Sequence, residues 1–176
     1  QVEERRAVID TFRTALLSGP VNDETFQAGT ASWDESDALA AWELQKVTTT
    51  ASPIRAIPDN NGTGITSTIT VPVSPNGINI SESVEVTFSA SHAHSGDLEV
   101  TLTGPGIPGT QSVLAVRHDC VDGVTSCSAY NSWVFSSVRY LNEAADGDWT
   151  LTVKDLATGT TGTFQSWRLK IYGRTS

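Results

Sequence analysis

Three short segments of this chain alternate strictly between apolar and polar side chains, and this alternation constrains the fold more than any other feature. The apolar sets are Leu98-Val100-Leu102, Trp149-Leu151-Val153 and Trp167-Leu169-Ile171. Successive side chains of a β-strand point to opposite faces, so each segment buries one face of a sheet and exposes the other. The pattern therefore predicts β-strands in this part of the chain.

More short alternating runs follow Pro58, separated by the turn residues Gly, Pro and Asn. All the predicted strands together span residues 65–71, 84–89, 97–103, 112–117, 133–136, 148–155 and 166–172. Seven strands in about 119 residues predict an all-β sandwich, but periodicity alone does not separate a jelly roll from an immunoglobulin-like topology. The predicted core includes Trp149, Trp167, Leu98 and Leu151.

The first 57 residues have a different texture. A short amphipathic helix is predicted to end near residue 18, because Gly19-Pro20 follows apolar residues at helical spacing, namely Val8, Ile9, Phe12, Ala15 and Leu16. From residue 21 to 57 the signals conflict and predict mixed structure, while the run TTTASP at 48–53 is expected to be a linker. We therefore divide the chain into an N-terminal extension, 1–57, and a β-sandwich domain, 58–176.

Charge and hydropathy exclude two classes of partner. The chain has 11 Lys+Arg against 20 Asp+Glu, a formal net charge of -9, and binding to a phosphate backbone needs clustered basic residues. A nucleic-acid partner is therefore not expected. No run of about 18 apolar residues occurs, so no membrane span is expected either. The low charged fraction and the many Ser and Thr residues suit an extracellular all-β module.

Two cysteines, Cys120 and Cys127, flank the polar loop VDGVTS. A loop of this length can bring their Cα atoms within bridging distance, so a local disulfide and an oxidising compartment are predicted. The alternatives are a reduced cytosolic pair and, less favoured, a zinc site, for which a second Cys or His pair at ligand spacing is missing.

Four ordered blocks of sequence carry a family resemblance. They are His92-Ala-His-Ser-Gly96-Asp97-Leu98, then Leu102-Thr-Gly-Pro105-Gly106 with Gly109-Thr110, then Gly147-Asp-Trp149-Thr-Leu151-Thr-Val153-Lys-Asp155, and Gly162-Thr-Phe164-Gln-Ser-Trp167-Arg-Leu169 closing on Tyr172-Gly173. At this order and spacing, residues 57–173, about two-thirds of the chain, resemble the P domain, or Homo B domain, of kexin- and furin-like subtilisin-family proteases and of related secreted bacterial proteases.

The resemblance implies an eight-stranded jelly-roll sandwich that acts as a noncatalytic accessory domain of a secreted protease. Its implied partner is the catalytic domain of the same parent chain, whose folding, stability, calcium dependence and pH range it supports. Residues 1–57 contain none of the catalytic sequence blocks of a subtilisin. The alternative is a jelly-roll module that binds substrate, carbohydrate or protein for a secreted hydrolase.

A catalytic role for the chain itself is not expected. The best local set for a hydrolytic triad is His92 or His94 with Ser95 and Asp97. Successive residues at a strand entrance point to opposite faces, so these groups are not expected to converge. The resemblance instead gives His92 a hydrogen-bonding role within the scaffold.

Calcium is the cofactor that the sequence best accommodates, because oxygen ligands from closely spaced Asp residues form such sites. Candidate ligands are Asp97 and Asp155 in the family-like blocks, and Asp119 and Asp122 in the loop around the cysteines. Some bacterial P domains that resemble this chain carry calcium. The alternative is that these carboxylates are solvated turn residues or strand caps.

Overall fold

A computed structural model describes residues 45–73, 77–119 and 127–175. The helix predicted before residue 18, and the mixed structure predicted up to residue 44, lie outside this part of the chain. The elements in chain order are β1 (Gln45–Ala51), β2 (Arg55–Ile57), β3 (Asn61–Val71), β4 (Ile80–His92), the 3-10 helix η1 (Ser95–Asp97), β5 (Leu98–Gly106), β6 (Gly109–Ala115), β7 (Tyr130–Ser137), β8 (Gly147–Asp155) and β9 (Gly162–Arg174).

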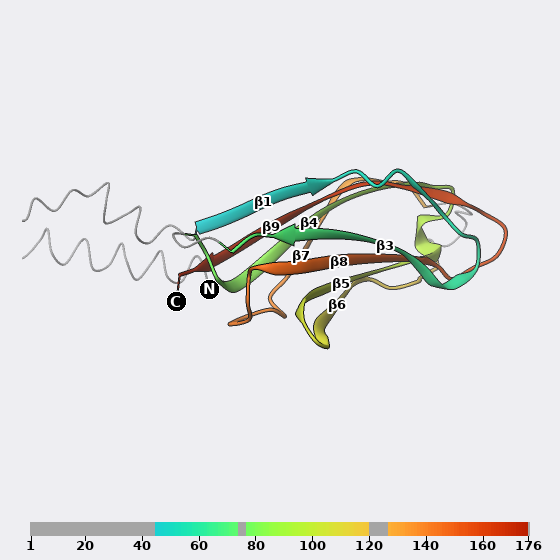
Figure 1. Ribbon diagram of the computed structural model, residues 1–176. Helices are drawn as coiled ribbons and strands as arrows, with labels where there is room; N and C mark the ends of the chain where they lie inside the picture. Colours follow the sequence, from blue (N-terminus) through green and yellow to red (C-terminus); the bar gives the residue numbers. More distant parts are fainter. Residues whose placement is uncertain (1–44, 74–76, 120–126, 176) are drawn as a thin grey trace, which may run out of the picture. The chain divides into compact units, whose positions relative to one another are not determined.

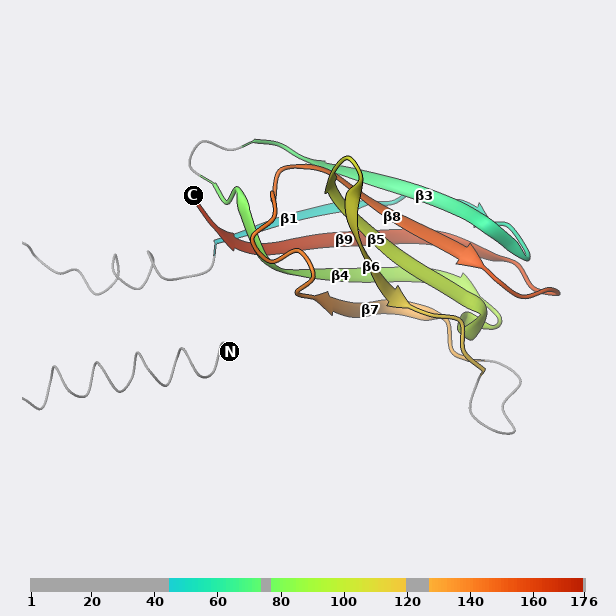
Figure 2. The same cartoon turned by 90° about the horizontal axis from the view of Figure 1, so that it is seen from below.

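The strands form two antiparallel sheets that face each other, as Figures 1 and 2 show from two sides. One sheet has the order β1-β9-β4-β7, with β2 also paired to β9, and the other has the order β3-β8-β5-β6. Apart from β2 and the β5–β6 hairpin, each strand lies in the sheet opposite to that of the strand before it. This is the connectivity of a jelly roll, so the implied jelly-roll sandwich is confirmed.

The core lies between the two sheets and follows the predicted alternation. Trp149 on β8 and Trp167 on β9 come from opposite sheets and are 0% and 1% exposed, and Leu98 and Leu151 are also fully buried. Each indole N–H is hydrogen-bonded, that of Trp149 to the Ala145 carbonyl at 2.9 Å and that of Trp167 to Ser67 Oγ at 3.0 Å. These two positions are the main anchors of the sandwich, because each buries a large ring whose polar N–H is hydrogen-bonded.

All seven predicted strands are present, as β3 to β9, and each overlaps its predicted range, while β1 and β2 were not predicted. The linker predicted at 48–53 is wrong over residues 48–51, which belong to β1 and pair with β9 from Thr48↔Lys170 to Ala51↔Trp167. Thr is β-branched and fits a pleated strand, and the ladder with β9 satisfies the backbone of a segment that lacks bulky side chains. The described part of the sandwich therefore includes two strands that precede residue 58, β1 and β2.

Candidate functional site

A buried contact between two titratable side chains joins the two sheets at one end of the sandwich. His92 is the last residue of β4 and Asp155 is the last residue of β8. His92 Nε2 lies 3.0 Å from Asp155 Oδ2, and both side chains are 0% exposed. A Cβ added to Gly162 would lie 2.6 Å from Cδ2 of the His92 ring, so only glycine at this position of β9 leaves room for the imidazole.

Both nitrogens of the His92 ring are engaged within the scaffold. Nδ1 lies 2.7 Å from the carbonyl oxygen of His94, an atom that can only accept, so Nδ1 carries a hydrogen. The His94 amide nitrogen also lies near Nδ1, at 3.2 Å, but the carbonyl contact is shorter and decides the direction of the bond. With Nε2 facing the Asp155 carboxyl group, the ring has no free nitrogen with which to accept a proton from a nucleophile.

Ser95 does not complete a triad with this pair. Its hydroxyl donates to the Ser128 carbonyl oxygen at 2.6 Å, and the residue is 4% exposed in the 3-10 turn. His94 is near Asp97, with Nδ1 3.7 Å from Oδ2, on the more exposed side of the same turn. Sequence reasoning missed the partnership of His92 with Asp155, because residues 63 positions apart meet only when the two sheets pack.

The candidate calcium ligands are not gathered into one site in the described residues. Asp155 uses Oδ2 for His92 and accepts the Ala157 amide at Oδ1, at 3.1 Å. Asp97 is near it, because Asp155 pairs with Leu98 and the Asp97 carbonyl accepts the Leu156 amide. Asp119 is exposed, and Asp122 lies outside the described residues. No group of three or more His, Cys, Asp or Glu that could hold a metal ion is found in the described ranges. Calcium stays a prediction.

The disulfide also stays a prediction, because Cys120 lies outside the described residues. Three of the five tryptophans, Trp33, Trp42 and Trp133, are not among the predicted core residues. Trp33 and Trp42 lie outside the described residues. Trp133 on edge strand β7 is 57% exposed, and its ring meets the Tyr130 ring edge-on, with the two ring centroids 6.2 Å apart.

None of the helices in the described ranges is long and apolar enough to cross a membrane.

Residues 81–171, just over half of the chain, match the family profile described as the proprotein convertase P-domain. The chain belongs to the proprotein convertase P-domain family. The buried His92, the fully buried Asp155 and the core tryptophan Trp149 all fall inside the matched span. The P-domain resemblance seen in the sequence is therefore confirmed.

Curated relatives include proprotein convertase subtilisin/kexin type 4 of Mus musculus, which is 38% identical over 94 residues, or 52% of this chain and 13% of the relative. The human type 4 protein is 37% identical over 100 residues, covering 56% of this chain and 12% of its own length. The chain thus spans about an eighth of these relatives.

Two solved structures share the fold. The serine protease of Aeromonas sobria matches with a TM-score of 0.60 and 21% identity over 73% of this chain and 27% of its own. The same protease in complex with the chaperone ORF2 matches with a TM-score of 0.61 and 20% identity, over 81% of this chain and 29% of its own.

Proposed function

We propose that this chain is a noncatalytic accessory domain of a secreted subtilisin-like serine protease. The observation that supports this most directly is the P-domain match over residues 81–171, in a chain that corresponds to only about an eighth of its protease relatives. The proposed partner is the catalytic domain of the same parent chain, and the proposed location is extracellular.

The absence of a catalytic role for this chain is supported by the bonding of His92 and Ser95, the best candidates in the sequence. A general base needs a ring nitrogen within hydrogen-bond reach of the nucleophile. Both His92 nitrogens are occupied by Asp155 and the His94 carbonyl, and the Ser95 hydroxyl donates to a main-chain carbonyl. Peptide cleavage is therefore assigned to the parent protease and not to this domain.

The accessory role has a simple physical basis. A partner that binds only the folded form of a catalytic domain stabilises that form by mass action. When the partner is on the same chain, its effective concentration reaches the order of millimolar for a short flexible linker. A weak interface can then shift the folding equilibrium of the catalytic domain.

The test is made on the parent protein, whose coding sequence is read upstream of Gln1. We expect a serine-protease domain there, and we expect removal of residues 45–176 to lower the yield and melting temperature of that domain. The purified 176-residue chain should not cleave casein or fluorogenic peptides. A parent without a protease domain would contradict the accessory role. So would turnover by the isolated chain that disappears in His92→Ala or Ser95→Ala.

A further inference from the structure

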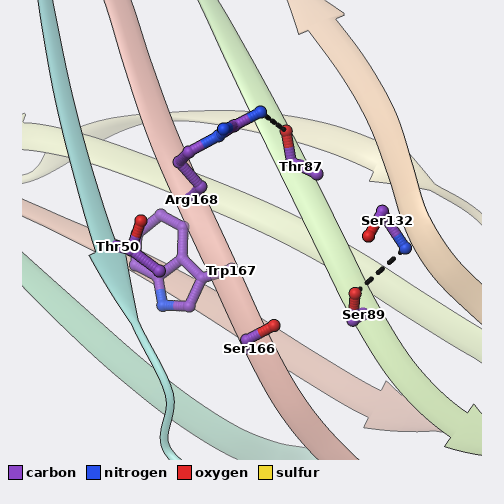
Figure 3. Close-up of a pocket in the computed structure, with 7 residues that line it drawn as sticks. All are labelled: Thr50, Thr87, Ser89, Ser132, Ser166, Trp167 and Arg168. Atoms are coloured by element: carbon purple, nitrogen blue, oxygen red, sulfur yellow. Dashed lines mark hydrogen bonds between the residues drawn. The ribbon is translucent and has the colours of Figure 1, made fainter.

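A hollow of about 250 Å³ lies on the outer face of the five-stranded sheet, away from the His92–Asp155 pair. Residues of four neighbouring strands line it, as Figure 3 shows: Thr50 of β1, Ser166, Trp167 and Arg168 of β9, Thr87 and Ser89 of β4, and Ser132 of β7.

Two β-bulges meet at Ser89 and shape this hollow. Between Ser89 and Ala90 the pairing with β9 skips Gln165, because Ser89 pairs with Ser166 and Ala90 with Phe164. Opposite the same part of β4, strand β7 also has one extra residue, since Phe88 pairs with Trp133 but Ala90 pairs with Tyr130. Bulges in a sheet redirect side chains and are frequent next to functional sites.

The backbone at the β7 bulge has an unusual conformation, and the side chain of Ser89, which lines the hollow, is bonded to it. Ser132 has a φ of +52°, which is uncommon for a residue other than glycine. Its amide donates to Ser89 Oγ at 3.0 Å in place of a ladder bond. The strained residue is therefore supported by a hydroxyl that also lines the hollow.

Two hydroxyl groups that line the hollow, those of Thr87 and Ser89, act as acceptors and keep their own hydrogens for donation. Ser89 Oγ accepts from the Ser132 amide, and Thr87 Oγ1 accepts from Arg168 Nη2 at 3.3 Å. A hydroxyl that accepts in this way still has its own hydrogen to donate. Within the described part of the chain neither hydroxyl donates to a protein acceptor, and Arg168 has four further N–H groups.

Arg168 also supplies a positive charge that no acid neutralises in the described residues. The described ion pairs of the other cations on β8 and β9 join Lys154 to Glu99, Lys170 to Glu85 and Arg174 to Glu82. Within the described ranges Arg168 has no such partner, and its directly opposite neighbours on β1 and β4 are the neutral Thr50 and Thr87. A guanidinium that has no ion-pair partner in the described residues, and that lies beside the Thr87 hydroxyl, is complementary to an oxyanion.

We propose that this hollow is a binding site for a carboxylate. The planar Arg168 fork matches the two oxygens of a carboxylate, and Thr87, which contacts the same guanidinium, donates to the group from the adjacent strand. A single cation on a chain of net charge -9 favours a monoanion over phosphate or sulfate dianions. Trp167 offers no exposed ring for stacking a neutral sugar, since it is 1% exposed and its indole binds Ser67 on the opposite sheet.

The test is an NMR titration of the ¹⁵N-labelled chain at constant ionic strength with acetate, D-glucuronate and the α-amide of N-acetylglutamate. Glucose and the corresponding glutamine derivative are the uncharged controls. With the acids, we expect chemical-shift changes at the amides of Ser89, Ser132 and Arg168 that saturate at millimolar ligand concentrations. With the uncharged controls, we expect no such changes. Tighter binding of glucuronate identifies a sugar acid as the source of the carboxylate, and tighter binding of the glutamate derivative identifies an acidic polypeptide.

Arg168→Gln should weaken binding about tenfold or more, because it removes a charge-assisted hydrogen bond from an exposed side chain. Thr87→Val, which keeps the side-chain volume, should weaken it by a smaller factor. Arg117→Gln is the matched control, because Arg117 is exposed and lies outside the hollow. Shifts that do not saturate would overturn the proposal. The same conclusion follows if binding is unchanged in Arg168→Gln or is weakened equally in Arg117→Gln.

Discussion

His92→Ala tests whether the His92–Asp155 contact holds the two sheets together. The substitution removes the 3.0 Å contact of Nε2 with Asp155 and the 2.7 Å bond of Nδ1 to the His94 carbonyl. The Asp155 carboxyl group, which is 0% exposed, then keeps one partner among the described residues, the Ala157 amide. Loss of one partner from a buried pair of this kind costs about 3 to 5 kcal/mol.

The size of this loss makes it easy to measure. A sandwich of this length has a total stability of about 5 to 15 kcal/mol, so the variant loses a large share of it. Urea unfolding followed by tryptophan fluorescence should show a lower midpoint with an unchanged slope. The matched control is His94→Ala, because the His94–Asp97 contact is longer, at 3.7 Å, and its side chains are 37% and 18% exposed. That control should lose no more than about 0.5 kcal/mol.

A double-mutant cycle separates the contact from the cavity that each substitution creates. Asp155→Ala should also lose about 3 to 5 kcal/mol, and the double variant should be about 2 to 3 kcal/mol more stable than the sum of the single losses predicts. Additive losses would show that the two side chains do not depend on each other. A loss in His92→Ala no larger than in His94→Ala would refute the reasoning altogether.

Other predictions follow from the core and from the cysteines. Trp149→Ala and Trp167→Ala should each lose about 3 to 5 kcal/mol in urea unfolding, and wild-type curves would show that the ring is not an anchor. Burial raises the pKa of Tyr140 above its ordinary value near 10. The contribution of Tyr140 to the free energy of unfolding is therefore fully present below pH 10. Above pH 10 it falls by up to about 1.4 kcal/mol per pH unit, because the unfolded chain releases a proton that the folded chain keeps. Tyr140→Phe should reduce this alkaline slope. Intact-mass analysis should find Cys120 and Cys127 oxidised, and reduction should cost about 2 to 3 kcal/mol. A calcium site would raise the melting temperature in millimolar calcium relative to excess EDTA, and identical curves would rule out a stabilising ion.

The part of the fold that the sequence predicts is the part in which burial alternates along a strand. Strands such as β8, with Trp149 and Leu151 facing inward, are recognisable because the core needs an apolar residue at every second position. Strand β1 was missed because its Thr-rich segment has no such pattern, and its place depends on the ladder with β9. Local sequence does not encode that pairing.

The same reason explains why the polar features were harder to predict. The hollow depends on bulges in β7 and β9 that can be located only from the register of both strands against β4. The sequence near Ser132 and Ser166 looks like an ordinary exposed face, and no motif marks Arg168 as unpaired. Polar sites built across strands are properties of register, and register is set by the whole sheet.

The His-Ala-His-Ser block looks like a source of catalytic groups, but the burial of its first histidine gives it a different role. A catalytic imidazole needs one nitrogen open to substrate. Both ring nitrogens of His92 instead contact groups of the scaffold, and the side chain is 0% exposed. An accessory domain stabilises its partner only while it is itself folded, because mass action requires the binding-competent form. The His92–Asp155 pair would then affect a parent protease through the folded fraction of this domain. A substitution there should lower the yield of active protease most at temperatures near the melting point of the sandwich, without changing the turnover of the molecules that do fold.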